Sequence, residues 1–133
     1  MWQDLLAQEC YDALISEAGS VLPGENYFAE AQLYIGFAQL AEGAAPTDSV
    51  LYLHFAEQNL PELTTVDPSR ELLLLYRGQM IIYGRLADDY DRDDLRAKAE
   101  DYLAKAVSVA PPSEVELIRT EFYQRAYDSD IRP

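Results

Sequence analysis

The chain has 133 residues, of which 49% are hydrophobic and 26% are charged, and its formal net charge at pH 7 is −14. This length fits one domain, and an apolar fraction near half excludes intrinsic disorder as the default, because such a chain can bury enough surface to offset its ordering entropy. The single cysteine, Cys10, excludes a disulfide within the chain. The first residues carry no basic charge and no apolar stretch reaches about 18 residues, so we expect a cytoplasmic protein without a signal peptide or membrane span.

The charge is distributed unevenly along the chain. Residues 1–69 contain eleven Asp and Glu and no Lys or Arg, whereas residues 70–133 contain thirteen acids and ten bases, so the two segments carry net charges of −11 and −3. A field of one sign repels phosphate backbones and attracts cationic surfaces, which disfavours direct nucleic-acid binding. The alternative is that the acidity only maintains solubility.

Helical spacing of the apolar residues predicts an all-α chain of about six helices, and no segment alternates with period two for long enough to predict a strand. The first helix is expected over residues 2–18, followed by a turn at Ser20–Asn26 that contains Pro23-Gly24. The remaining helices are expected at about Asn26–Leu40, Thr47–Pro61, Pro68–Arg85, Asp93–Val109 and Ser113–Tyr127, with an acidic loop at Asp88–Asp94.

Capping residues set these expected helix ends. Short polar side chains satisfy the free N–H groups at a helix start, proline fits the first helical position, and glycine or proline ends a helix. The expected starts are Asn26, Thr47, Asp67 with Pro68, Asp93 or Asp94, and Ser113 with Glu116 as a capping box, and the expected stops are Gly43 and Pro61.

Two of the expected helices share one series of small, apolar and proline residues at an offset of fifty positions. Each of them follows a helix with a central glycine, Gly36 or Gly78, where the lack of a side chain lets two helices approach closely. The pattern predicts a repeated αα-hairpin. The matching residues are Ser49, Tyr52, Leu53, Ala56 and Pro61 in the first helix, and Ala99, Tyr102, Leu103, Ala106 and Pro111 in the second.

Together with Leu33 before Gly36 and Leu75 before Gly78, this series resembles the tetratricopeptide repeat family. The resemblance covers two units, residues 29–61 and 71–111, within a single domain of residues 1–133. It implies stacked helical hairpins with flanking helices at both ends. An unrelated six-helix bundle is the alternative.

The sequence departs from the family pattern at three places. Gln32 and Leu74 stand where the family has a bulky aromatic residue, and Arg77 stands where an apolar residue is usual before the glycine. The second unit also has extra residues between its helices, around Leu86–Arg96.

The resemblance implies a concave surface, lined by the first helix of each unit, that in this family holds peptides or helices of other proteins. Most side chains expected there are apolar, and the first unit offers no cation for a carboxylate terminus, so we expect an amphipathic helix or extended apolar segment with basic flanks. The alternative for the apolar residues is that they form the core. The expected partner-binding residues are Glu30, Leu33, Phe37, Leu40, Leu72, Leu75, Gln79, Ile82 and Tyr83.

Residues that support catalysis are scarce, and we expect neither an enzyme nor a bound cofactor. His54 is the only histidine, and no phosphate loop or dinucleotide fingerprint occurs. Cys10 lies on an amphipathic face without a basic neighbour to lower its pKa, and is expected to be a buried structural cysteine.

One acidic pattern copies the ligand spacing of a calcium loop, with Asp89, Asp91 and Asp93 followed by Glu100. The glycine that the sharp turn of such a loop requires is replaced by Asp94. We therefore expect no metal site, and interpret these aspartates as helix-capping residues.

These observations predict a non-catalytic protein–protein interaction module, such as an adaptor or a protein similar to the small acidic chaperones of secretion systems. The ten tyrosines fit this hypothesis, because tyrosine is frequent at interfaces, although it is also frequent at the edges of cores. The alternative, from another class, is an acidic inhibitor, such as an immunity protein or a nucleic-acid mimic, that blocks a basic enzyme. Neither hypothesis specifies the oligomeric state.

Overall fold

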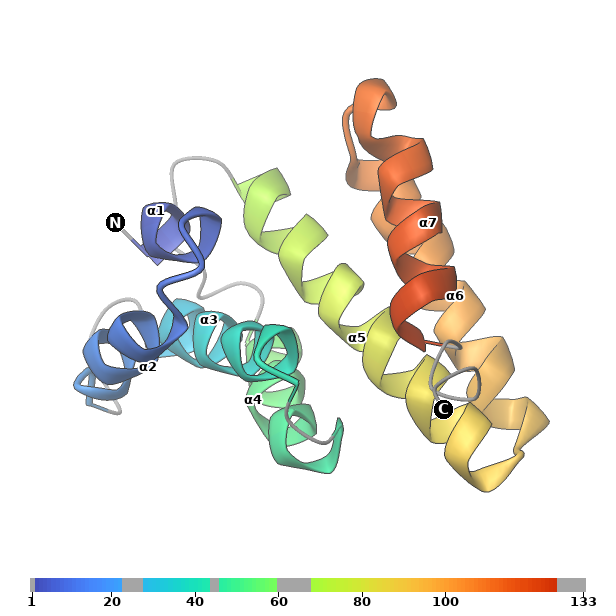
Figure 1. Ribbon diagram of the computed structural model, residues 1–133, viewed down its shortest axis with the longest axis horizontal. Helices are drawn as coiled ribbons and strands as arrows, with labels where there is room; N and C mark the ends of the chain where they lie inside the picture. Colours follow the sequence, from blue (N-terminus) through green and yellow to red (C-terminus); the bar gives the residue numbers. More distant parts are fainter. Residues whose placement is uncertain (1, 23–27, 44–45, 60–67, 127–133) are drawn as a thin grey trace. The chain divides into compact units, whose positions relative to one another are not determined.

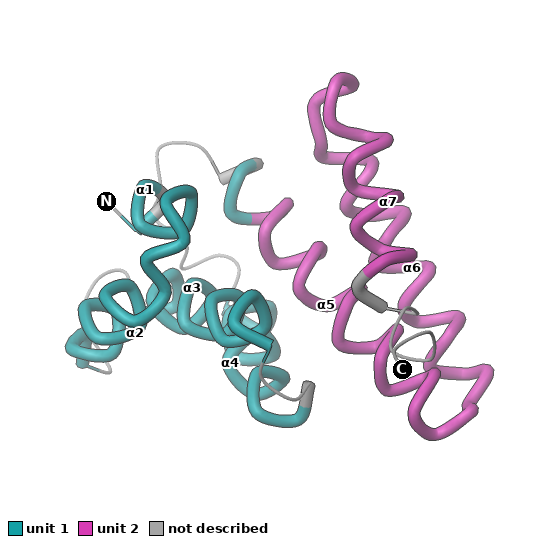
Figure 2. The backbone as a smooth tube through the Cα atoms, viewed as in Figure 1, with its two compact units in different colours: residues 1–71 teal, residues 72–133 magenta. Residues whose placement is uncertain are grey.

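The computed structural model describes residues 2–22, 28–43, 46–59 and 68–126, and these residues form seven α-helices and one short 3-10 helix, with no strand among them (Figure 1). The all-α prediction is confirmed. The chain divides into two compact units, residues 1–71 (unit 1) and residues 72–133 (unit 2), which are described separately (Figure 2).

Unit 1 contains α1 (Trp2–Ala7), α2 (Tyr11–Gly19), α3 (Phe28–Ala41) and α4 (Pro46–Gln58). The prediction of one continuous helix over residues 2–18 is wrong, because the chain breaks between α1 and α2. Glu9 has a positive φ of 59°, its N–H donates to the Leu6 carbonyl, and the Cys10 N–H donates to the Leu5 carbonyl. This bonding pattern ends a helix, and it usually employs glycine at the position that Glu9 occupies.

The α3 and α4 helices pack closely, as Gly36 predicts. A Cβ atom at Gly36 would lie 3.0 Å from the Tyr52 Cβ and 3.1 Å from the Leu53 side chain, so only glycine fits without displacing α4. The small and apolar residues of α4 that carry the repeat pattern, Ser49, Leu53 and Ala56, are fully buried.

Unit 2 contains α6 (Asp93–Val109), the 3-10 helix η2 (Pro112–Glu114), α7 (Val115–Ala126) and most of α5 (Pro68–Tyr90). The α5 helix begins at Pro68, as predicted, but extends beyond Arg85 to Tyr90. The predicted acidic loop at residues 88–94 is therefore wrong, since only Asp91 and Arg92 separate α5 from α6. Asp91 has a positive φ of 52° and the Arg92 N–H donates to the Ala87 carbonyl, which ends α5 in the same way as α1.

The helix ends predicted at Pro68 and Gly43 are confirmed, whereas the described residues that were predicted as polar caps lie within helical turns. Gly43 has a φ of 94° just after α3, and its N–H donates to the Leu40 carbonyl. Thr47 and Asp93 lie inside the first turns of α4 and α6, and Ser113 lies within η2. Arg92, at the cap position of α6, makes no side-chain cap hydrogen bond. Asn26, Pro61, Asp67 and Tyr127 lie outside the described residues.

The length and apolarity needed to cross a lipid bilayer are not found together in any helix of the described residues.

Candidate functional site

The residues predicted to line a partner-binding groove are mostly buried, which corrects the prediction that they form an open surface. Four of them lie on α3 of unit 1 and five on the unit 2 part of α5. Side chains with under 5% exposure cannot contact a partner without rearrangement. Glu30, Leu33, Phe37, Leu40, Leu75, Gln79 and Ile82 are each at most 4% exposed, and Leu72 and Tyr83 are half-buried.

The physical reason is the composition of α3, which is apolar on nearly every side. Ten of its fourteen residues are buried, so this helix has no face left for a partner. The periodicity of its apolar residues identified a helix, but it did not show which side was covered by the chain itself.

Two pairs of polar side chains, one buried and one partly buried, make contacts that the sequence did not predict. In unit 1, the Tyr34 hydroxyl donates a 2.6 Å hydrogen bond to Glu71 Oε2, and both residues are buried. In unit 2, Arg77 of α5 makes two 2.7 Å hydrogen bonds to the Glu121 carboxylate of α7. Burial opposes the charge of Arg77, but the hydrogen bonds and charge of Glu121 outweigh it and raise the pKa of the guanidinium. Arg77, which departs from the repeat pattern, therefore has a structural role.

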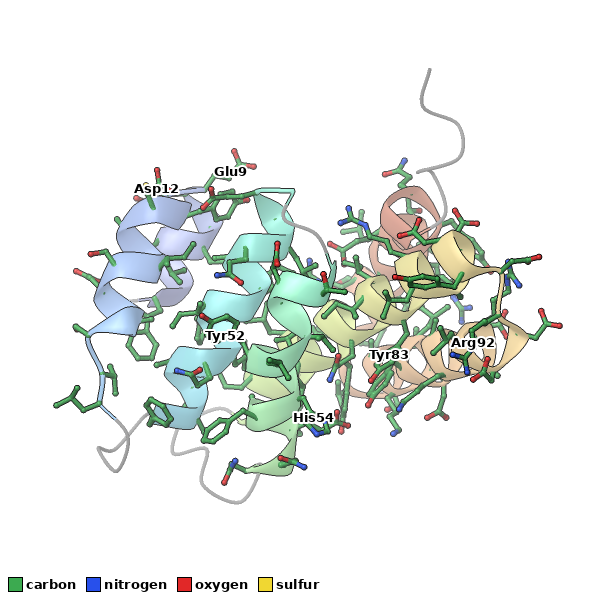
Figure 3. The ribbon with its side chains drawn as sticks, turned by 90° about the horizontal axis from the view of Figure 1, so that it is seen from below. Glu9, Asp12, Tyr52, His54, Tyr83 and Arg92 are labelled. Carbon is green, nitrogen blue, oxygen red and sulfur yellow. The ribbon has the colours of Figure 1, made fainter. Side chains whose placement is uncertain are left out.

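Unit 1 presents carboxylates that have no cationic partner. Its helices and loops expose six acidic side chains, and none of them forms an ion pair in the part of the chain that the structure describes. Glu9 and Asp12 point outward from the junction of α1 and α2 (Figure 3). We call these residues the unit 1 acidic surface: Asp4, Glu9, Asp12, Glu17, Glu42 and Asp48.

Unit 2 instead pairs many of its exposed acids with arginine. At the turn between α5 and α6, Arg92 binds Asp94 at 2.6 Å, and Arg96 binds Asp93 at 2.9 Å and Asp91 at 3.2 Å. The hydrogen bond from Arg92 lowers the pKa of Asp94, and the hydrogen bond to Asp91 raises the pKa of Arg96. These contacts offset part of the negative charge of the acidic segment within the unit itself.

The residues of the calcium-like spacing are distributed over two helices and the turn between them. Asp89 lies in α5 and Glu100 in α6, while Asp91 and Asp93 pair with Arg96. Among the described residues, no three His, Cys, Asp or Glu side chains come together in a way that would hold a metal ion.

The sole cysteine is exposed, so the prediction of a buried structural thiol is wrong. The break at Glu9 places Cys10 at the cap position of α2, where its Sγ lies 3.8 Å from the Gln8 carbonyl oxygen. His54 is also exposed, on the outer side of α4 (Figure 3).

Large apolar side chains reach the surface at a few positions. Leu22 and Leu51 are 63% and 74% exposed in unit 1. Leu51 lies on α4 one turn after Asp48, so an exposed leucine and an unpaired carboxylate share one face of this helix. The remaining large apolar residues that are exposed lie in unit 2: Tyr90, Leu117 and Tyr123.

Comparisons with protein-family models, with curated proteins and with solved structures found no match. The similarity to tetratricopeptide repeats therefore depends on the residue pattern alone.

Proposed function

We propose that the chain is a non-catalytic protein-binding module, and that the unit 1 acidic surface docks a basic segment of another protein. The observation that carries this proposal is the set of six exposed carboxylates that form no ion pair within the described parts of the chain. Residues 1–69 also contain no Lys or Arg. Such a surface raises the rate of encounter with a cationic partner and opposes anionic ones.

An apolar contact gives this interaction its second part. Because most residues of the predicted groove are buried, the exposed side chain of Leu51 replaces them as the apolar contact. With Asp48 on the same face of α4, it fits an amphipathic helix that carries basic residues beside its apolar stripe. A client of this kind is what an adaptor or a secretion-type chaperone would hold.

An acidic inhibitor of a basic enzyme is the second candidate, and the same six carboxylates favour it. The two candidates differ in what holds the complex together. Binding by charge alone weakens steeply between low and moderate ionic strength, whereas an interface with an apolar centre retains affinity.

A pair of matched charge variants tests the proposal with a basic amphipathic peptide as the probe. In unit 1, Glu9→Gln, Asp12→Asn and Glu17→Gln together remove three exposed charges. We expect them to weaken binding about tenfold, because exposed ion pairs contribute about 0.2–1 kcal/mol each. The unit 2 control, Glu100→Gln, Glu114→Gln and Glu116→Gln, removes the same charge and should change the affinity less than about twofold.

Equal losses in the two variants, measured by isothermal calorimetry, would show that net charge rather than the unit 1 acidic surface controls binding. Leu51→Ser separates the two candidate functions at moderate ionic strength. A loss of affinity supports the amphipathic client, and an unchanged affinity with steep salt dependence supports the inhibitor.

A further inference from the structure

The chain contains two lysines, and both lie over tyrosine rings on one side of unit 2. Lys98 and Lys105 are two turns apart on α6. The Lys98 ammonium lies 4.6 Å from the centre of the Tyr83 ring, and that of Lys105 lies 5.0 Å from the Tyr102 ring and 6.0 Å from the Tyr76 ring. We call these five residues the lysine–tyrosine cluster.

The rings of the lysine–tyrosine cluster are held in place by the packing of α5 on α6. Tyr83 of α5 stacks on Tyr102 of α6, with ring centres 5.6 Å apart and planes inclined by 8°, and Tyr76 lies 6.3 Å from Tyr102. Tyr102 is 6% exposed, whereas Tyr76 and Tyr83 are half-buried and present part of their surface to solvent. A partner would therefore meet aromatic groups whose orientation is already fixed, which lowers the entropic cost of binding.

The ammonium groups of the cluster are less engaged by carboxylates than three arginines of unit 2 are. Arg77, Arg92 and Arg96 are each held by carboxylates at 2.6–3.2 Å. Lys98 has no carboxylate within ion-pair distance in the described part of the chain, and Lys105 has one exposed partner, Asp101, at 3.3 Å. In a chain with 24 acidic residues, this leaves a cation available to an external anion.

We propose that the lysine–tyrosine cluster is a docking surface for an acidic polypeptide segment that carries aromatic or aliphatic side chains between its carboxylates. The two ammonium groups supply charge complementarity, and the rings of Tyr76 and Tyr83 supply apolar contact between them. These two tyrosines are seven residues apart on α5, which corresponds to about 10 Å along a helix and matches a peptide better than a small anion.

Nucleic acid does not fit this surface. Sequence-independent binding to a phosphate backbone depends on neutralising several phosphates at once, whereas the cluster offers two ammonium groups on a chain of net charge −14. This proposal is independent of the unit 1 acidic surface, which selects the opposite charge, so a protein with both surfaces would contact two different partners.

The test uses the full chain labelled with ¹⁵N and a glutamate-rich peptide that contains tyrosine and leucine. We expect chemical-shift changes centred on Lys98, Tyr102 and Lys105, and none from a lysine-rich peptide at these positions. Lys98→Gln with Lys105→Gln should lower the affinity for the acidic peptide about fivefold. The control, Arg92→Gln with Arg119→Gln, removes the same charge from exposed positions outside the cluster. It should lower the affinity for the acidic peptide less than about twofold.

Tyr83→Leu extends the test, because it preserves an apolar contact with Tyr102 and every charge while removing the ring. This substitution should lower the affinity for the acidic peptide without changing the helical circular dichroism. No shift with the wild-type chain, or equal losses in the lysine and arginine variants, would overturn the proposal. Concentration-dependent self-association that the Lys98→Gln and Lys105→Gln changes abolish, measured by sedimentation velocity, would also overturn it by assigning the surface to a second copy of the chain.

Discussion

The two helical units differ in whether their exposed carboxylates form ion pairs with arginine. In unit 1, helices α3 and α4 make their close approach through a glycine and bury apolar side chains, while six exposed carboxylates have no cationic partner among the residues that the structure describes. In unit 2, α5 is joined to α7 by the Arg77–Glu121 pair, and Arg92 and Arg96 form ion pairs with the aspartates at the turn between α5 and α6.

The difference shows which charges are available for binding. A carboxylate that is already held by arginine must lose that contact before it meets a partner, whereas an unpaired one loses only its hydration. Charge on unit 1 is therefore free to act on other molecules, while most of the arginine charge on unit 2 stabilises the unit itself. The lysine–tyrosine cluster is the exception on unit 2, since its ammonium groups lie mainly over rings.

The largest expected effect concerns packing in unit 1. Gly36→Leu places a side chain where even a Cβ would lie 3.0 Å from Tyr52, so we expect the free energy of unfolding to fall by about 3 kcal/mol through overpacking. Urea denaturation followed by circular dichroism measures this loss. Hydrogen exchange should show faster opening in α3 and α4.

Gly19→Ala is the control for this substitution. Gly19 is the last residue of α2, and nothing lies within 4 Å of its Cβ position, so we expect no loss of stability. If Gly36→Leu were tolerated as well as Gly19→Ala, the close contact of α3 with α4 would be refuted.

A smaller effect is expected from the partly buried ion pair of unit 2. Arg77→Met leaves the Glu121 carboxylate, whose side chain is 17% exposed, without its two hydrogen bonds, and should lower the free energy of unfolding by about 2 kcal/mol. Adding Glu121→Leu should restore part of the loss, because no unpaired charge then remains. Chemical denaturation of these two variants and of Glu121→Leu alone measures the coupling between Arg77 and Glu121.

Arg119→Met provides the matched control on α7. Its pair with Glu116 is exposed and 3.9 Å long, so its removal should cost less than about 0.5 kcal/mol. A similar cost for Arg77→Met and Arg119→Met would mean that burial adds nothing to the Arg77–Glu121 pair.

The smallest effect is expected from Asp94, and it depends on pH. The hydrogen bond from Arg92 lowers the pKa of Asp94 in the folded chain, so the unfolded chain binds a proton here more readily. The stabilisation from Asp94 is therefore complete above the pKa of an unfolded aspartate and is lost as the pH falls through the lowered folded pKa. We expect the melting temperatures of the wild type and of Asp94→Asn to become more similar as the pH falls from 7 into this acidic range. A difference between them that stays constant would contradict the assignment.

Several elements of the fold were predicted from local chemistry. Pro68 begins α5 and Gly43 follows the end of α3, because proline is suited to a first helical turn and glycine tolerates a positive φ. The close approach at Gly36 was also predicted. The breaks at Glu9 and Asp91 were not, since glutamate seldom adopts a left-handed conformation and aspartate, although enriched there, adopts it in only a minority of cases.

The candidate surfaces were harder to predict than the helices. The predicted groove failed because apolar spacing marks the buried faces of a helix without saying what buries them, and Leu33 and Ile82 are completely covered. The lysine–tyrosine cluster was missed because its tyrosines lie on two helices, with Tyr76 and Tyr83 well before Tyr102 in the sequence, although the rarity of lysine is visible in the composition.

By itself, the sequence determined that the chain is helical and that its net negative charge is concentrated in the first half, since both follow from residue types and their spacing. Only the tertiary structure decided which carboxylates are paired and which apolar side chains are covered. Burial and ion pairing depend on distances between residues far apart in the chain, such as the 44 positions that separate Arg77 from Glu121, and local propensity carries no information about such distances.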